Sequence, residues 1–183
     1  HCVSTFALQL NREMIPHEAA AVLTGLPDLQ ADFSLDDVRR GWEPDTGVVV
    51  ADVFRDGIPL ELAPRSVLKR VVGEWAGLGF EVNVGIELEA YLFVPDGDGW
   101  KPIHTPGSHV YGTGPMQDPS GTIDELMKVA NIIRMPLESV NSEYDDGQFE
   151  LTLHYTDALT AADDAFLFKQ MAREIAADRG VLL

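Results

Sequence analysis

Apolar residues in the second half of the chain follow the regular spacings of helices and strands. Residues three and four apart are apolar in three segments, which predicts helices over 66–77, 123–134 and 158–179. Strand-type residues fill 80–93, and the segment 137–155 predicts a hairpin. Residues 95–119 are rich in Gly and Pro and are predicted to form a long loop, a feature that is often functional in a compact domain.

The first 62 residues give weaker signals. Residues 3–10 predict a strand and 17–24 a short helix, whereas 26–46 is predicted to be mostly loop with one helical turn from Leu35. A boundary falls near Pro64, so we expect two regions, residues 1–62 and residues 63–183.

A buried-type strand is predicted over 48–54. The dipeptide Asp56-Gly57 that follows it favours a tight turn, after which 58–62 would pair back as a hairpin. Strands and helices thus occur together along the chain, and the expected fold class is α+β.

The acidic composition excludes several classes of partner. The 183 residues include 13 Lys and Arg and 30 Asp and Glu, for a formal charge of −17. Because the chain has no run of Lys or Arg, neither nucleic acid nor an anionic membrane surface is expected as a partner. No apolar run approaches the roughly 20 residues of a membrane span. Since Cys2 is the single cysteine, a reducing compartment, the cytoplasm, is expected.

Two carboxylates share one face of the strand predicted around residues 85–93. Alternate strand residues point to the same side, so Glu87 and Glu89 face away from the apolar Ile86 and Leu88. Side chains of equal charge at this spacing repel each other unless water or a cation lies between them. For a single pair of this kind, a solvated sheet face is the favoured interpretation.

The predicted hairpin adds a second pair of carboxylates. Asp146-Gly147 is a strong two-residue turn signal, and a turn there would set Glu143 directly opposite Glu150. Like charges directly opposite destabilise a sheet unless a cation lies between them. Mg²⁺, held by one or two carboxylates together with substrate phosphates, is the natural candidate. An exposed acidic hairpin is the alternative, and physical arguments alone leave both open.

Four segments resemble landmarks of the glutamine synthetase family. Residues 85–93 resemble its G-x-E-x-E-x-x-L-F strand, and residues 143–150 resemble its E-x-x-x-G-Q-x-E hairpin. Residues 64–70 resemble the P-R-S-x-x-x-R helix that opens the family's catalytic domain. Tyr111, followed by Asp118, fits the loop before the next helix of that domain. The four landmarks occur in the right order and at plausible separations.

The resemblance runs from about Gly47 to the end of the chain and implies both a fold and an activity. The fold would be a partial β-grasp-like region in residues 1–62, followed in 63–183 by the first half of a glutamine synthetase-type catalytic domain, an antiparallel sheet with flanking helices. The activity would be that of an ATP-dependent carbon–nitrogen ligase, which joins ammonia or an amine to the γ-carboxylate of glutamate through γ-glutamyl phosphate. Such enzymes use Mg²⁺ or Mn²⁺ at two sites and form ring homo-oligomers, commonly dodecamers.

The same resemblance implies the metal ligands. Glu89, Glu143 and Glu150 would hold the first metal, and Glu87 would help to hold the second at the ATP phosphates. Glu143 would also be the carboxylate that deprotonates the incoming ammonium. These residue types suit phosphoryl transfer, which depends mostly on positioning and charge neutralisation.

Three further residues match the family, each with another explanation beside it. Tyr111 matches a tyrosine near the amine site, but a loop aromatic packed on the core is the commoner explanation. Tyr155 matches an aromatic at the adenosine end, although its strand parity is that of a core-facing stripe. Glu138 matches a glutamate that faces the nucleotide. Its parity is opposite to that of Glu143, so the match requires a bulge or bend between them.

The chain departs from the family pattern beside the amine pocket. Ser142 stands where many members have His, and Asp145-Asp146 stand in a turn where ammonia-using members often have small residues or Pro. Both changes favour larger amines, such as polyamines, over ammonia. Beyond the point that corresponds to Leu183, the family supplies its nucleotide loop, a metal-binding His and catalytic arginines. The chain therefore holds half an active site, and we expect it not to catalyse ligation alone.

Two other classes of function stay open. A catalytically silent family member, acting as a structural or regulatory subunit, would keep the fold without the reaction. An unrelated acidic domain that binds Ca²⁺ or only solvates itself is the third class. The sequence contains no EF-hand loop, so Ca²⁺ sensing has little support.

Overall fold

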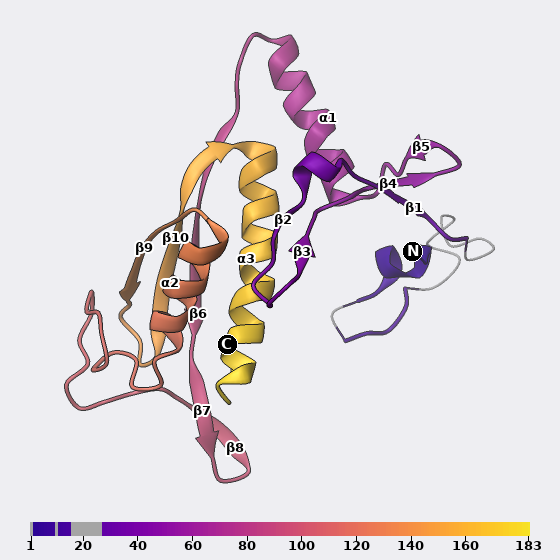
Figure 1. The fold of residues 1–183 in the computed structure, drawn as a ribbon. Coiled ribbons are helices and arrows are strands. Elements are labelled where there is room, and N and C mark those ends of the chain that lie inside the picture. The colour runs from indigo at the N-terminus through magenta and orange to yellow at the C-terminus, as the bar shows by residue number, and fades with distance from the viewer. Residues whose placement is uncertain (1, 10, 16–26) are drawn as a thin grey trace. The chain divides into compact units, whose positions relative to one another are not determined.

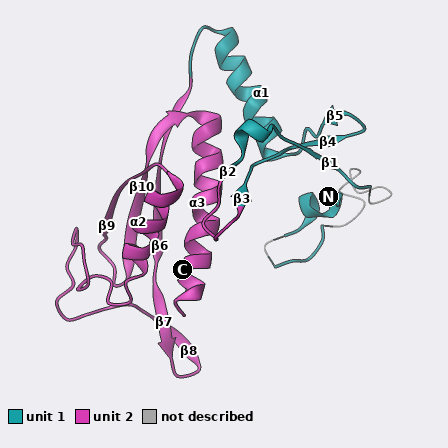
Figure 2. Ribbon diagram, in the orientation of Figure 1, with its two compact units in different colours: residues 1–39, 47–81 teal, residues 40–46, 82–183 magenta. Residues whose placement is uncertain are grey.

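A computed structural model of the chain describes residues 2–9, 11–15 and 27–183. It divides into two compact units, which are coloured separately in Figure 2. The first unit comprises residues 1–39 and 47–81, and the second comprises residues 40–46 and 82–183. The helix predicted over 17–24 lies outside the described residues. The division into domains near Pro64 stays a prediction.

The first unit is built from short elements and one longer helix. In chain order these are η1 (Val3–Ala7), β1 (Gln30–Asp32), η4 (Leu35–Asp37), β3 (Gly47–Val48), β4 (Asp52–Arg55), β5 (Ile58–Pro59) and α1 (Pro64–Gly77). Strand β2 (Arg39–Arg40) lies across the boundary between the two units. Strand β4 lies between β1 and β5 in an antiparallel sheet, and β2 pairs with β3. A small apolar core consists of Val3, Ala7, Leu29, Leu60 and Ala63. A β-grasp-like arrangement of this region stays a prediction.

Two strand predictions for the first unit are wrong. Residues Val3–Ala7 form a 3₁₀ helix instead of a strand, with Val3 and Ala7 buried. The single strand predicted over 48–54 is divided between two sheets. Its first part, β3, pairs with β2, whereas β4 pairs with β1 and β5.

The turn signal at Asp56-Gly57, the helical turn from Leu35 and the helix predicted from near Ser66 are confirmed. Asp56 and Gly57 have φ values of 52° and 76°, the positive values that a two-residue hairpin turn of type I′ requires. A single helical turn begins at Leu35, where the Ser34 hydroxyl accepts a hydrogen bond from the Asp36 N–H. Helix α1 begins at Pro64. Proline has no backbone N–H, and it is tolerated at the first helical position because an N–H there would have no intrahelical partner.

The second unit holds a three-stranded antiparallel sheet and two helices (Figure 1). Its elements are β6 (Asn83–Tyr91), β7 (Phe93–Asp96), β8 (Gly99–Pro102), α2 (Thr122–Ile133), β9 (Leu137–Ser142), β10 (Gln148–Asp157) and α3 (Ala158–Asp178). The strand order is β6-β10-β9. Helix α3 contacts β6 and β10, and α2 contacts β9 and α3. The mixed fold with antiparallel sheets that the sequence predicts is therefore confirmed.

Apolar side chains of the sheet and of the helices form the core of the second unit. Phe149, Leu151 and Leu153 alternate along β10 and are all buried. Opposing residues on α3, among them Phe168 and Met171, are fully buried. Because successive strand residues point to opposite faces, this packing turns the other residues of β6, β9 and β10 away from the helices.

The segment predicted as one loop over 95–119 contains regular structure. Strands β7 and β8 form a hairpin in which Asp96 pairs with Gly99, around a turn where Gly97 has a φ of 58°. The central residues of this turn are Gly97 and Asp98, and glycine at the first central position is the sequence signal of a type II′ turn, so the sequence contained it. Within the described residues, no helix has the length and apolar character needed to cross a membrane.

Candidate functional site

The face of the sheet turned away from α2 and α3 carries polar side chains from all three strands, and we call it the polar sheet face. Its members are Glu87, Glu89 and Tyr91 of β6, Gln148, Glu150 and Thr152 of β10, Asn141 of β9, and Glu143 directly after β9. All four predicted metal ligands are in this set. That they bind metal stays a prediction.

The pairing of the strands differs from the predicted register. Glu150 lies opposite Glu89 on one side and Asn141 on the other. Glu143 pairs instead with Gln148, whose carbonyl accepts a hydrogen bond from the Glu143 N–H at 2.8 Å. The predicted opposition of Glu143 and Glu150 is therefore wrong, and the directly opposed like charges are Glu89 and Glu150.

A four-residue connection explains this shift of register. Asp146 and Gly147 are the central residues of a turn closed by a hydrogen bond of 3.0 Å from the Gln148 N–H to the Asp145 carbonyl. The ladder stops at Glu143 and Gln148, so Tyr144 and Asp145 also belong to the connection. The turn signal was thus read at the right dipeptide, but the loop is two residues longer than a minimal hairpin.

Neutral side chains donate hydrogen bonds to three of the carboxylates of the polar sheet face. The Gln148 side-chain amide donates to Glu89 at 2.6 Å, and the Asn141 amide donates to Glu143 at 3.0 Å. The Thr152 hydroxyl donates to Glu150 at 3.2 Å. None of the ion pairs found among the described residues involves Glu87, Glu89, Glu143 or Glu150.

The oxygen-rich donor set suits a hard divalent cation, which prefers carboxylate, carbonyl and water ligands. The side chains are not drawn together around one point, however. In the part of the chain that the structure describes, no group of three or more His, Cys, Asp and Glu side chains is close enough to hold a metal ion. The chemistry of the donors fits the ion, and binding would require the glutamates to change rotamer.

Tyr111 lies at the edge of this acidic region. Its side chain is 63% exposed, which is incompatible with the alternative that it packs on the core. The Tyr111 and Tyr144 rings meet edge to face, with centroids 5.8 Å apart. Hydrogen bonding and charge at Tyr144 raise the pKa of Tyr111 most, followed by desolvation and by the negative charges of Glu143 and Glu150. Tyr111 is therefore close enough to Glu143 and Glu150 for their charges to contribute to this shift.

Two irregularities in the sheet decide where Glu138 and Tyr155 lie. The register between β9 and β10 shifts between Thr152 and Leu153, leaving Glu138 without a partner in the ladder. This is the bulge that the match at Glu138 required. A carboxylate oxygen of Glu138 lies 3.6 Å from Nδ1 of His154.

A second register shift, between β10 and β6, moves Tyr155 out of the core. It falls between Leu153 and Thr156, and Tyr155 is 74% exposed. A Cβ atom on Gly85 would lie 3.6 Å from Cβ of Tyr155, so the two residues are neighbours across the strands. Gly85 has the parity of Glu87 and Glu89. The core-facing parity inferred for Tyr155 is therefore wrong, because a bulge reverses the alternation.

Tyr91 is a member of the polar sheet face that sequence reasoning missed. Its hydroxyl donates to Asp145 at 2.7 Å, and this hydrogen bond is the main reason that the pKa of Tyr91 is raised. The signal that would have found it is its spacing, two residues after Glu89 on the same strand.

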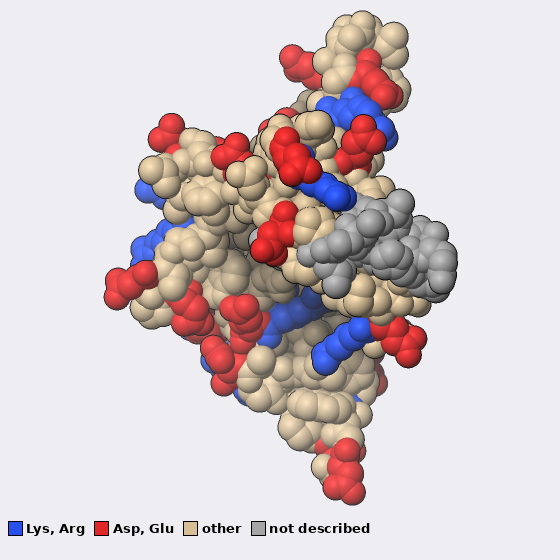
Figure 3. All heavy atoms as spheres, turned by 90° about the vertical axis from the view of Figure 1, so that its right-hand side faces the viewer, with Lys and Arg blue, Asp and Glu red and all other residues tan. Residues whose placement is uncertain are grey.

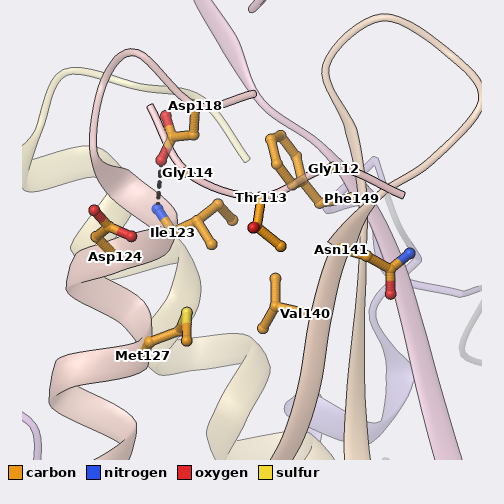
Figure 4. A pocket seen from close by; sticks show the side chains of 10 residues that line it. All are labelled: Gly112, Thr113, Gly114, Asp118, Ile123, Asp124, Met127, Val140, Asn141 and Phe149. Carbon is orange, nitrogen blue, oxygen red and sulfur yellow. Dashed lines mark hydrogen bonds between the residues drawn. The ribbon is translucent and has the colours of Figure 1, made fainter. Parts of the chain in front are cut away.

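The second unit also contains cavities. A pocket of about 100 Å³ is bordered by the connection itself and by His104, Ser108 and Gln117. A larger cavity of about 330 Å³, shown in Figure 4, lies against α2 and the helix-covered side of β9. In that view the apolar side chains of Ile123, Met127 and Val140 point into the cavity, and Asn141 points away from it. Asp118 and Asp124 line this cavity, whereas none of the glutamates of the polar sheet face does so.

Most acidic residues lie elsewhere. In the view of Figure 3, Asp and Glu side chains are scattered over the visible surface in small groups, with fewer Lys and Arg among them. On this face, the acidic residues are therefore not concentrated at one site.

Comparison with known proteins adds independent information. The family model described as the glutamine synthetase catalytic domain matches residues 61–183. A glutamate–isopropylamine ligase from a Pseudomonas species is 32% identical over 148 residues, covering 76% of this chain and 32% of that protein. A glutamine synthetase from Rhizobium meliloti is 34% identical over 167 residues, covering 87% of this chain and 36% of that protein. The chain thus spans about a third of the length of the curated relatives it matches.

Solved structures agree with this similarity. A GmaS–ADP complex superimposes with a TM-score of 0.73 at 29% identity, over 85% of this chain and 36% of that one. The glutamine synthetase of Plasmodium falciparum gives a TM-score of 0.69 at 18% identity, over 89% of this chain and 39% of that one, and so supports the fold alone.

Proposed function

The chain belongs to the glutamine synthetase family, and we propose that it supplies part of the active site of an ATP- and divalent-metal-dependent ligase that joins ammonia or an amine to the γ-carboxylate of glutamate. The observation that carries the proposal is the cross-strand pair Glu89 and Glu150, with Glu143 on the same face and neutral groups around all three. A sheet with such a pair is less stable than one without it, unless a cation offsets the repulsion.

The glutamates of the polar sheet face would hold Mg²⁺ or Mn²⁺. Glu89, Glu143 and Glu150 are assigned to one ion, and Glu87 is assigned to a second at the ATP phosphates. When bound, these ions would supply charge neutralisation for phosphoryl transfer from ATP to the glutamate γ-carboxylate. The bulges at Glu138 and between Leu153 and Thr156 support a role for Glu138 and Tyr155 at the nucleotide, because they leave both residues free of the apolar core.

Glu143 and Tyr111 are assigned to the incoming amine. Asn141 donates a hydrogen bond to one carboxylate oxygen of Glu143 and leaves the second oxygen available to accept a proton from an ammonium group. The exposed rings of Tyr111 and Tyr144 stand beside it and offer aromatic faces to a cation. A larger amine than ammonia is favoured, in keeping with the glutamate–isopropylamine ligase among the relatives.

The reaction requires more of the site than this chain carries. Because the relatives are about three times as long, the remaining nucleotide and metal contacts are assigned to sequence outside the 183 residues. We propose that this chain does not catalyse amide synthesis by itself, and that the active form is a cytoplasmic ring homo-oligomer, commonly a dodecamer in this family.

The proposal is tested on the full-length protein with glutamate, ATP, Mg²⁺ and a panel of amines, by measuring phosphate release and γ-glutamyl amide formation. Glu150→Gln should lower kcat/KM at least about a hundredfold, since it removes a charge that the transition state requires. The matched control is Glu81→Gln, an exposed glutamate before β6, which should retain activity within about twofold.

Calorimetric titration of Mg²⁺ and Mn²⁺ separates the possible outcomes. The wild type should bind, and Glu143→Gln and Glu150→Gln should bind more weakly by about tenfold or more. Metal binding without amide synthesis would favour a catalytically silent subunit. Equal metal binding by the wild type and both variants would remove the metal site from the proposal.

A further inference from the structure

Ser142, the last residue of β9, holds a loop of the chain through four hydrogen bonds. Its carbonyl accepts from the Tyr111 N–H at 2.9 Å, and its own N–H donates to the Gly112 carbonyl at 3.1 Å. Its hydroxyl accepts from the Gly112 N–H at 3.0 Å and donates to the His109 carbonyl at 2.8 Å. The Ser142 side chain is buried, so these bonds are shielded from water. Both hydrogen-bonding functions of the hydroxyl are thus used on residues 109–112.

The loop needs such support because Tyr111 has an unfavourable backbone conformation. Its φ is 60°, in the left-handed region that residues other than glycine, asparagine and aspartate seldom adopt. A conformation of this kind persists only where surrounding contacts impose it, and it occurs often at functional sites. Here, two of the contacts come from the backbone of Ser142 and two from its hydroxyl.

Gln117 closes the other side of the loop. It is 4% exposed, and its side-chain oxygen accepts a hydrogen bond from the His109 N–H at 3.0 Å. A Cβ atom on Gly112 would lie 2.4 Å from the Gln117 amide nitrogen, so the loop fits closely between Gln117 and Ser142. Outside this loop, the Tyr111 side chain contacts Tyr144, to whose hydroxyl its own hydroxyl donates at 3.5 Å.

Ser142 also adjoins the carboxylate that the proposed reaction uses. Glu143 follows it directly, and Asn141, which precedes it, donates to the Glu143 carboxylate. One three-residue segment therefore sets the position of Glu143 and, through Ser142, the position of Tyr111. An ammonium group between them would meet a negative charge and an aromatic ring together, which is how proteins bind organic cations.

We propose that Ser142 is a positioning residue, which fixes Tyr111 beside Glu143 and so sets the affinity of the site for the amine substrate. The inference rests on the proposed function for the identity of that substrate. It predicts that removing the Ser142 hydroxyl weakens amine binding selectively, because the Gly112 N–H and the His109 carbonyl keep only the 3.3 Å hydrogen bond between them and Tyr111 is held less firmly.

The test compares Ser142→Ala with Ser142→Thr in the full-length protein. Ser142→Ala should raise the KM for the amine about tenfold, with the KM values for glutamate and ATP within about twofold of the wild type. Ser142→Thr keeps the hydroxyl and should restore the amine KM to within about threefold. The matched control is Ser139→Ala on the same strand, an exposed serine, which should leave all three KM values unchanged.

A second measurement does not depend on activity. With 3-fluorotyrosine at position 111, ¹⁹F NMR of the metal-free protein should show one line in the wild type, in Ser142→Thr and in Ser139→Ala. In Ser142→Ala the line should shift and broaden as the ring samples several positions. Ser142→Cys, which keeps the volume but bonds weakly, supplies the same comparison if Ser142→Ala does not fold.

The outcomes are separable. A wild type that makes no amide overturns the proposed function, and the ¹⁹F comparison still decides the role of Ser142. An active wild type with an unchanged amine KM and an unchanged ¹⁹F line in Ser142→Ala overturns the inference alone. An equal loss for amine, glutamate and ATP, with no recovery in Ser142→Thr, also overturns it, because that result describes general structural damage.

Discussion

Asp52 in the first unit and Glu150 in the second are both acidic residues on antiparallel sheets, but their surroundings differ in charge. Asp52 on β4 forms ion pairs with Arg65 and Lys69 of α1. Glu150 on β10 lies opposite Glu89 and receives a hydrogen bond from the neutral Thr152 hydroxyl. The chain thus neutralises the first carboxylate with its own cations and leaves the second without one.

This difference separates a structural carboxylate from one that suits a ligand. Burial on its own would raise the pKa of Asp52, but the hydrogen bonds from Lys69 and Arg65 outweigh burial and hold the pKa below its usual value. The protein itself therefore supplies the cations that neutralise Asp52. A pair such as Glu89 and Glu150 stores repulsion that an external cation can relieve, and so it couples stability to metal binding.

The largest effect on stability is expected from a substitution in the connection between β9 and β10. Gly147 has a φ of 75°, and a Cβ atom there would lie 2.9 Å from both the Leu92 carbonyl oxygen and the Ile103 nitrogen. Gly147→Ala should therefore destabilise the protein by about 3 kcal/mol. This figure combines the cost of placing alanine in the left-handed backbone region with the cost of the clash between its Cβ and the neighbouring backbone atoms. Thermal unfolding measures this change.

Gly97→Ala in the β7–β8 turn is the matched control. Gly97 has a φ of 58°, but a Cβ atom there would meet nothing within 4 Å. It should cost about 1 kcal/mol, the conformational part alone. Equal losses in the two variants would show that the close packing of Gly147 is not what fixes the connection.

Asp52→Asn should have the next largest effect. Losing a carboxylate that two cations share should destabilise the protein by about 1 kcal/mol at pH 7, or about 2–4 °C in Tm. Because the folded-state pKa of Asp52 lies below its unfolded value, the stabilisation is fully present above the unfolded pKa and is lost as the pH falls through the folded pKa. The Tm difference between wild type and Asp52→Asn should therefore shrink below about pH 4.

Asp56→Asn is the control for that series. Asp56 lies in the same hairpin with its side chain 92% exposed, and its φ of 52° is one that asparagine also adopts. It should change Tm by less than about 1 °C across the pH range. A Tm difference for Asp52→Asn that did not vary with pH would contradict the role assigned to its charge.

The helices and strands of the second unit were predicted from the sequence better than those of the first unit, for a physical reason. Long periodic segments such as α2, α3 and β6 bury one face, so their spacing alone identifies them. The segments 3–7 and 48–54 are short, and their secondary structure depends on contacts with distant parts of the chain. Local patterns do not contain that information.

Irregularities limited the prediction of the candidate site in the same way. Alternation placed Glu87 and Glu89 correctly on one face, but it misplaced Tyr155 because a bulge adds one residue to β10. The length of the connection after Glu143 changed the register of β9 against β10 by two residues, so that Asn141 instead of Glu143 lies opposite Glu150. The contacts of Ser142 join residues about 30 positions apart, which no local motif encodes.

The smallest effect, and the one that tests the comparison most directly, is expected from Glu150→Gln without metal. Removing one of two opposed charges should stabilise the chelator-treated protein by about 0.5 kcal/mol, whereas Asp52→Asn destabilises it. With saturating Mg²⁺ the order should reverse, because the wild type gains binding energy that Glu150→Gln lacks. Glu81→Gln should be neutral in both conditions. A loss of stability for Glu150→Gln in chelator would mean that Glu89 and Glu150 do not repel, and the contrast with Asp52 would then not hold.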